Sequence, residues 1–247
     1  MEVHHHAHSP GKKWTHYFWE FLMLFLAVFC GFIAEYQLEH VIEHQREKSY
    51  IHSMIEDLQN DTTEIKEVIS FNIKKFRGMD SLIALLNDSE ISSDDESRLY
   101  MLNRKYAANI YTMGFSDQTM RQLINSGNMR LISNQNTADS ILNYYGQSKE
   151  QIIGQEEVYG EMSKRLLFTA EDIFDQEFTA VKMDNNNNFY RLPPKEDIKL
   201  LTRDGKTIKK YAQMVWTAQG MLAVYLNLLI DMKQRAEKLL GYLKHNY

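Results

Sequence analysis

The sequence predicts an all-α fold, in which a single N-terminal transmembrane helix continues into a long helix and an antiparallel helical bundle. Three observations predict it. None of the three prolines falls between Gly11 and Leu192, apolar residues beyond residue 50 recur with helical spacing, and residues 17–36 are apolar enough to cross a bilayer. Because proline breaks a helix interior, its absence over most of the chain favours long helices. No alternation typical of a strand or hairpin is visible, so we expect no strands.

The transmembrane helix is expected over residues 17–36. Its centre, residues 21–34 (FLMLFLAVFCGFIA), carries no charge and no amide, and aromatic residues flank both ends, as in the interfacial belt of membrane proteins. Twenty helical residues span about 30 Å, the thickness of a bilayer's hydrocarbon core. A cleaved signal peptide is disfavoured because Phe32 is too large for the −3 position of a cleavage site there. A lipoprotein is disfavoured by Phe29 before Cys30, and a buried core helix by the aromatic flanks.

Charges around this helix predict its orientation. Two lysines precede it, at positions 12 and 13, and three glutamates follow it closely. By the positive-inside rule, residues 1–16 form a cytoplasmic His-rich tail and residues 37–247 a periplasmic helical bundle domain. The expected location is therefore a bacterial inner membrane, with the lipid bilayer as the first partner.

One face of the predicted span carries small residues. Ala27 and Gly31 lie about one turn apart and form a small-xxx-small pair, which lets two helices approach closely, and Glu20 lies on the same side. We expect Glu20, Ala27 and Gly31 to form a homo-oligomer interface. The alternative is that the pair arises by chance in an apolar helix and that Glu20 is solvated at the membrane surface.

From Ile51 to Leu86 the apolar residues follow a seven-residue alternation, which Thr62 and Asn72 interrupt. No helix breaker separates this stretch from the predicted span, so we expect one continuous helix with a kink at Gly78. The pattern leaves open whether the stripe packs within one chain or between chains.

Four further helices are expected. Ser93 and Glu96 form a capping-box pattern, and Ser126-Gly127-Asn128 is typical of a helix end with Gly127 in the left-handed conformation. Residues 214–230 are apolar enough to suggest a second span, but their amides favour the most buried helix of a bundle. The expected helices cover residues 93–111, 117–126, 136–178 and 206–244, with an exposed loop at 184–194.

Two segments carry a resemblance to a known family. The first is Arg46-Glu47-Lys48-x-Tyr50-Ile51, through Ile55-Glu56-Asp57-Leu58 to Asp61, and the second is Leu123-Ile124-Asn125-Ser126-Gly127-Asn128-Met129-Arg130-Leu131-Ile132-Ser133-Asn134 followed by Ile141 and Tyr144-Tyr145. Over roughly residues 17–150 the chain resembles a family of uncharacterised, N-terminally anchored, single-pass membrane proteins of Bacteroidota. The resemblance implies a single-pass inner-membrane protein with a helical domain, and it implies no activity.

Histidines concentrate near the N-terminus, where imidazoles could bind a divalent metal such as zinc. The first candidate site is a run of four histidines in a tail, with a disordered tail as the alternative. The second is a pair of rows along the helix that leaves the span, where His40, Glu43 and His44 also match an H-x-x-E-H metalloprotease signature. In a homo-oligomer, rings of Glu39, His40, Glu43 and His44 could attract cations or sense pH; the alternative is a solvated charged face. The candidate metal ligands are His4, His5, His6, His8, His40, Glu43 and His44.

The remaining chemistry-bearing residues are expected to be structural. We expect the acidic face of Asp57, Asp61 and Glu64 to be solvated, and the aromatic residues of the last helix, Tyr211, Trp216 and Tyr225, to lie in the core.

Composition and motifs narrow the function. A net charge of −5 argues against nucleic-acid binding, and a single cysteine excludes a disulfide framework. No phosphate-binding glycine loop, CxxC or nucleophile motif occurs. We therefore expect a non-enzymatic scaffold, sensor or accessory subunit that acts through contacts with its own copies or with another membrane or periplasmic protein. The alternative is a metal- or proton-handling membrane oligomer.

Overall fold

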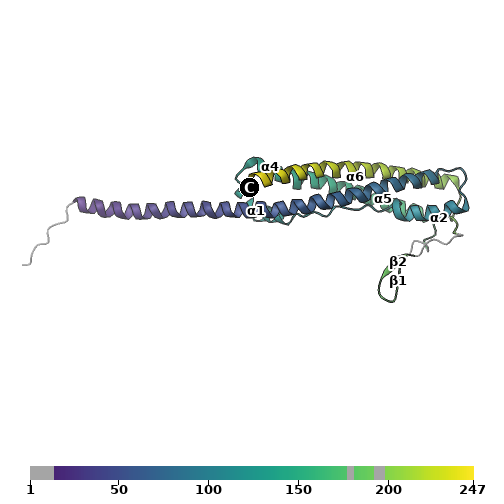
Figure 1. Cartoon of the computed structure of the whole chain (residues 1–247), viewed down its shortest axis with the longest axis horizontal. Helices are drawn as coiled ribbons and strands as arrows, with labels where there is room; N and C mark the ends of the chain where they lie inside the picture. The colour runs from purple at the N-terminus through teal and green to yellow at the C-terminus, as the bar shows by residue number, and fades with distance from the viewer. Residues whose placement is uncertain (1–13, 177–180, 192–197) are drawn as a thin grey trace, which may run out of the picture. The chain divides into compact units, whose positions relative to one another are not determined.

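The computed structural model describes residues 14–176, 181–191 and 198–247 and divides the chain into two units, residues 1–50 and 51–247. Nearly all described elements are helices, which confirms the all-α expectation (Figure 1). The longest is α1 (Trp14–Leu86), which contributes to both units. The expected continuity of the apolar segment with the heptad stretch is confirmed at the level of secondary structure.

The described part of residues 1–50 is the first half of α1 and contains the most apolar stretch of the chain. Its mean hydropathy is 2.0 and none of it is buried, so by length and composition it is a candidate membrane span. A second candidate lies in α6 (Gly205–Asn246), with a lower mean hydropathy of 1.2 and 39% of its window buried. The window in α1 is therefore uncovered, whereas the window in α6 packs partly against neighbouring helices.

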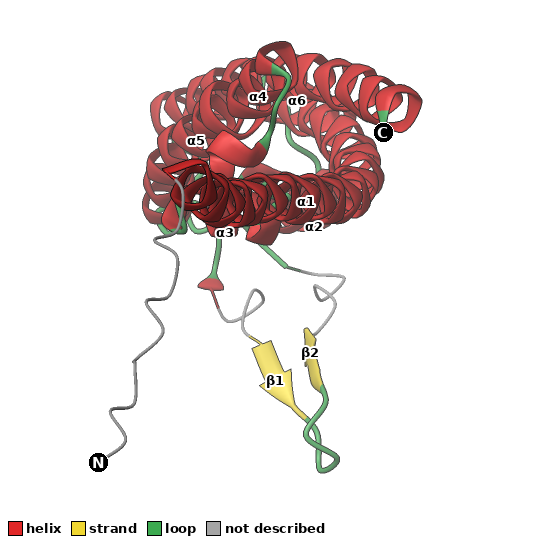
Figure 2. Cartoon of the chain, turned by 90° about the vertical axis from the view of Figure 1, so that its left-hand side faces the viewer, coloured by secondary structure: helices red, strands yellow, loops and turns green. Residues whose placement is uncertain are grey.

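Residues 51–247 contain further helices besides α1 and α6 (Figure 2). They are α2 (Ser93–Leu102), the π-helical η1 (Asn103–Ala107), α3 (Gln118–Asn125), the 3-10 helix η2 (Asn128–Leu131), α4 (Gln135–Leu142), the π-helical η3 (Asn143–Ser148) and α5 (Lys149–Ala170).

Helix α6 runs antiparallel to α5 and to the part of α1 beyond residue 50 (Figure 1). Against α1, Gln219 Nε2 donates to the Phe76 carbonyl at 3.1 Å, and Lys66 lies 3.9 Å from Glu237. Against α5, Gln155 Nε2 donates to the Met221 carbonyl at 3.1 Å. Since partner numbers rise on α1 as they fall on α6, these contacts establish the opposite directions of the two helices.

Apolar side chains fill the space between these helices. Leu58, Ile65 and Met79 of α1 and Tyr211 and Tyr225 of α6 are fully buried. Trp216 is 68% exposed, so the expectation that it lies in the core is wrong. It follows Val215, which is buried, and a helix turns successive side chains about 100° apart.

Two predicted helix boundaries are wrong. The capping box is made by Ser92 and Asp95, one residue earlier than expected, and the helix predicted over 93–111 is α2 followed by η1, which ends at Ala107. The helix predicted over 136–178 is α4, η3 and α5, and it stops at Ala170. Beyond Ala170 the chain turns, so that Ile173 and Phe174 become fully buried, and this burial outweighs continuation of the helix.

The expectation of no strands is also wrong, because a short hairpin overlaps the predicted loop and begins before it (Figure 2). Strands β1 (Val181–Met183) and β2 (Phe189–Arg191) pair antiparallel. Asp184 Oδ1 accepts hydrogen bonds from the amides of Asn186 at 2.8 Å and Asn188 at 2.9 Å, and Asn187 takes a left-handed φ of 64°. Asparagine tolerates that conformation, and aspartate side chains stabilise tight turns. Residues 184–188 (DNNNN), whose composition indicates a loop, therefore form the turn of a hairpin.

Two glycine predictions concern Gly127 and Gly78. Gly127 is left-handed, with φ of 68°, and ends α3 as expected. Gly78 lies inside α1 without interrupting it, and the kink expected there stays a prediction. The ring of Tyr106, from η1, lies directly on Gly78, and a Cβ there would approach three ring atoms more closely than real Cβ contacts allow. The residue is glycine because the π-helical turn packs against α1 at this point.

Replacing Gly78 with alanine should therefore destabilise the chain. A Cβ would push Tyr106 away, and overpacking of this kind lowers the free energy of unfolding by roughly 1–3 kcal/mol. Chemical denaturation followed by far-UV circular dichroism measures the change. Gly220→Ala is the matched control, since a Cβ there meets nothing within 4 Å. In a helix interior that change should stabilise by about 0.5–1 kcal/mol. Equal stabilisation by both changes would contradict the Gly78–Tyr106 contact.

Candidate functional site

The structure does not bring the predicted metal ligands together within the residues that it describes. His4, His5, His6 and His8 lie outside those residues. In α1 the ring of His40 packs edge-on against Tyr36, and His44 Nδ1 lies 3.4 Å from Glu47 Oε2. Over residues 14–176, 181–191 and 198–247 no group of three or more His, Cys, Asp or Glu side chains could hold a metal ion, and His40, Glu43 and His44 form none. A site formed between copies stays a prediction.

The predicted association face is open. A Cβ on Gly31 would meet nothing within 4 Å, and Glu20 Oε1 lies 3.0 Å from His16 Nε2, with both side chains about half exposed. The homo-oligomer interface of Glu20, Ala27 and Gly31 stays a prediction.

Polar side chains in residues 51–247 gather instead around residues 108–117, which we call the linking segment. It has neither helix nor strand structure, so its backbone groups cannot pair within an element of their own. Asn72 of α1 supplies both halves of one pairing: its Oδ1 accepts from the Tyr111 amide at 3.3 Å, and its Nδ2 donates to the Tyr111 carbonyl at 2.8 Å. Asn72, which interrupts the heptad pattern, therefore binds the backbone of the linking segment.

Every long helix contributes to the linking segment. Asp61 of α1 accepts from the Ser116 amide at 2.8 Å, and Glu156 of α5 accepts from the Met113 amide at 2.8 Å. Ser163 Oγ of α5 donates to the Ala108 carbonyl at 2.7 Å. Tyr225 of α6 donates to Glu156 at 2.5 Å and so orients that carboxylate.

Asp61 is fully buried, so the expectation of a solvated acidic face is wrong at this residue. Besides the Ser116 amide it accepts a hydrogen bond from the Tyr144 hydroxyl at 2.8 Å. Burial raises the pKa of Asp61, while these two hydrogen bonds act in the opposite direction. Asp61 lies seven residues from Met54 and seven from Val68, both fully buried, and so falls on the buried face of α1, whereas Asp57 lies off that row and is only half-buried.

Lys75 is a buried cation in the same region, and sequence reasoning missed it. Its Nζ donates to the Tyr106 carbonyl and lies 5.8 Å from the ring centre of Tyr159. No carboxylate among the described residues lies within ion-pair distance of it, and burial lowers its pKa to about 7. The Tyr159 hydroxyl is buried without a hydrogen-bond partner among those residues. Lys75 lies seven residues from Val68 and seven from Leu82, both of which are fully buried, so it occupies the buried face of α1.

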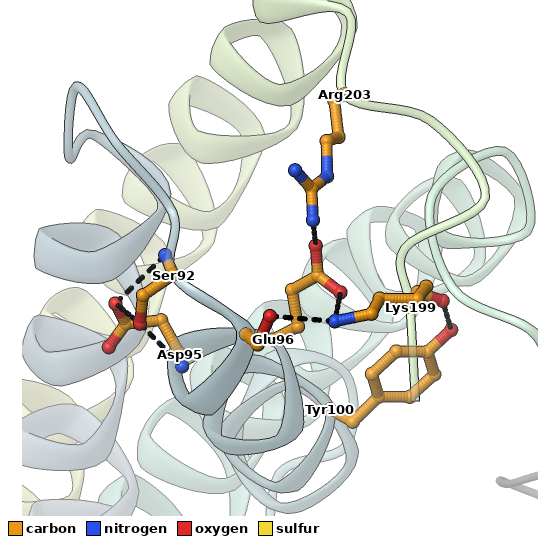
Figure 3. A network of polar contacts seen from close by, with 7 residues as sticks. Ser92, Asp95, Glu96, Tyr100, Lys199 and Arg203 are labelled. Carbon is orange, nitrogen blue, oxygen red and sulfur yellow. Dashed lines mark hydrogen bonds and ion pairs between the residues drawn. The ribbon is translucent and has the colours of Figure 1, made fainter. Parts of the chain in front are cut away.

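A second polar network joins α2 to the segment that enters α6 (Figure 3). The Glu96 side chain, fully buried, pairs with Arg203 and lies 3.8 Å from Lys199 Nζ, which donates to Ser93 Oγ at 2.7 Å. The Tyr100 hydroxyl accepts from the Asp175 amide at 2.7 Å and donates to the Lys199 carbonyl at 3.1 Å. The Tyr100 side chain thus connects residue 175, before the hairpin, to residue 199, after it. The predicted capping role of Glu96 is replaced by this ion pair.

A hollow of about 440 Å³ adjoins this network. Its lining includes Asp88 and Glu90 from the turn after α1 and Arg203 and Lys209 from the entry to α6. Opposite charges on two sides of a hollow can hold a small polar or zwitterionic ligand by ion pairing. Arg203 also pairs with Glu96, so a ligand here would compete for the same guanidinium.

No protein-family model matches the chain, and neither a curated protein nor a solved structure is detectably similar to it.

The stability of the chain should rise with pH between about 7 and 10 because of Lys75. Its pKa in the folded chain is about 7 against an ordinary value of 10.5, so in this interval the unfolded chain binds more protons. One such proton gives a slope of up to about 1.4 kcal/mol per pH unit. Lys75→Met should remove this slope, whereas Lys74→Met, on the exposed neighbour, should retain it. Denaturant titrations at several pH values measure the slope, and a slope that Lys75→Met leaves unchanged would refute the assignment.

Removing the Tyr100 hydroxyl should loosen the junction at the hairpin. Tyr100→Phe deletes the acceptor of the Asp175 amide, and losing one hydrogen bond worth about 1 kcal/mol speeds amide exchange by roughly fivefold to tenfold. Hydrogen exchange at residue 175 measures the change. Tyr190→Phe, on an exposed hairpin tyrosine, is the control and should leave that amide unchanged. An Asp175 amide equally protected in both variants would show that the hydroxyl does not tie this junction.

Proposed function

We propose that this chain is a single-pass membrane protein of a bacterial inner membrane, whose helical bundle serves as a scaffold, sensor or accessory subunit. It acts through protein–protein contacts and without catalysis. The observation that carries the proposal is the first half of α1, which has a mean hydropathy of 2.0 over a window with no buried residue, followed by a separately packed helical unit. An apolar helix with nothing covering it needs a bilayer or another apolar helix around it.

Self-association is the second part of the proposal. Gly31 has open space where a Cβ would stand, and with Ala27 it offers the close backbone approach that small residues provide between membrane helices. The positively charged residues before the span and the glutamates after it support a cytoplasmic N-terminus and a periplasmic C-terminal unit.

Membrane insertion and orientation have a direct test. With Cys30 replaced by serine, single cysteines are introduced at Ser9 and at the exposed Ser126. A membrane-impermeant maleimide should label position 126 but not position 9 in cells with a permeabilised outer membrane, and the protein should resist alkaline extraction. Labelling of position 9 alone would reverse the orientation, and release by alkali would refute the span.

Gly31→Leu should weaken self-association. Leucine adds bulk at the contact and moves the two helix axes apart, so the dissociation constant in the membrane should rise by roughly tenfold or more. Native mass spectrometry of the protein in mild detergent measures the subunit number and weighs any retained metal. Phe29→Leu, on the opposite side of the helix, is the matched control. A monomeric wild-type protein, or identical oligomers in both variants, would contradict the interface, and stoichiometric metal would favour the ion-handling alternative.

A further inference from the structure

A shallow groove of about 380 Å³ runs between α1 and α6 in residues 51–247. We call it the α1–α6 groove and define it by Lys66, Ile69, Ile73, Lys74 and Arg77 of α1 and Lys233 of α6. These helices are packed together along this stretch by the Gln219–Phe76 hydrogen bond and the Lys66–Glu237 ion pair.

The rim of the groove is basic in a chain whose net charge is −5. Lys66 and Lys233 share a single carboxylate, Glu237, at 3.9 Å and 3.7 Å. Lys74 and Arg77 are exposed, and no carboxylate among the described residues lies within ion-pair distance of either. Four cations therefore line the groove, and Glu237 is the one carboxylate of the described residues within ion-pair distance of any of them, so the rim favours anionic groups.

The floor of the groove is apolar. Ile69 and Ile73, one turn apart on α1, line the groove and are only half-buried. Half-buried isoleucines beside unpaired cations form a surface that is neither a closed core nor a fully solvated face.

We propose that the α1–α6 groove binds an acidic amphipathic helix of a partner protein. Its carboxylates pair with Lys74 and Arg77, and apolar side chains spaced by three or four residues cover Ile69 and Ile73. An inorganic polyanion or a nucleic acid matches the rim but leaves the apolar floor exposed to water, so the combination favours a protein helix. The inference rests on the proposed function, since it specifies the chemistry of the partner.

The probe is a synthetic helix-forming peptide with glutamates on one face and leucines on the other. Its binding to the full chain in zwitterionic lipid nanodiscs is measured by fluorescence anisotropy, with empty nanodiscs as the blank. Two further probes are a peptide of equal charge in which glutamine replaces each leucine, and inorganic polyphosphate. We expect the Glu/Leu peptide to bind at least tenfold more tightly than the Glu/Gln peptide, and more tightly at low salt.

The protein variants isolate the rim. Lys74→Glu/Arg77→Glu should weaken peptide binding by roughly tenfold or more. Lys206→Glu/Lys210→Glu, exposed residues elsewhere on α6 with the same change in charge, should leave it nearly unaltered. Circular dichroism of both variants verifies that each stays folded.

The proposal would be overturned by no binding of the Glu/Leu peptide, by equal binding of the two peptides, or by equal loss of binding in both double variants. Tighter binding of polyphosphate than of either peptide would make the groove a simple anion site and would also overturn it. The subunit number from native mass spectrometry on the same samples separates these outcomes from failure of the proposed self-association.

Discussion

The helical unit depends on satisfying the backbone of the linking segment, residues 108–117. A segment without helix or strand structure leaves its amides and carbonyls in need of partners, and each buried group left unpaired costs about 1–3 kcal/mol. Here the partners are side chains: Asn72 holds both polar groups of Tyr111, Asp61 holds the Ser116 amide, and Glu156 holds the Met113 amide. Because these side chains come from different helices, the segment joins α1 to α5 through polar contacts as well as apolar ones.

This requirement explains why polar residues occupy the buried face of α1. Asp61, Asn72 and Lys75 are almost fully buried, although each carries a polar group that water would otherwise solvate. Burying a charge is unfavourable unless hydrogen bonds replace its hydration. Asp61 has two donors, whereas Lys75 has the Tyr106 carbonyl as its acceptor, and burial lowers the pKa of the lysine accordingly. Both π-helical turns take part, since η1 presents the Tyr106 carbonyl and η3 presents Tyr144.

The sequence predicts what periodicity and local turn chemistry determine, and little of what distant contacts determine. The long α1, the left-handed Gly127 and the last helix follow from apolar spacing and from residues within one turn. The linking segment does not, because no proline interrupts residues 93–111 and its non-helical course depends on Asn72 and Asp61, far away in the chain. For the same reason the sequence predicts a capping role for Glu96 and not its ion pair, because its partner Arg203 lies 107 residues away. The basic groove combines residues of α1 and α6, and only their antiparallel packing brings these together.

The buried polar contacts also determine how α1 is positioned within the unit of residues 51–247. An apolar stripe with a seven-residue repeat can slide past its neighbours and repack, since another apolar residue replaces each one that moves. A slide of one turn, about 5.4 Å, would instead separate Asp61, Asn72 and Lys75 from their partners at the same time. Uncompensated buried polar groups make that shifted arrangement unfavourable by several kcal/mol. The polar contacts therefore select one register for α1, and the apolar stripe supplies the burial that stabilises it. In this register Lys66, Lys74 and Arg77 face Lys233 across the groove, so the same contacts that satisfy the linking segment also hold the basic surface in place.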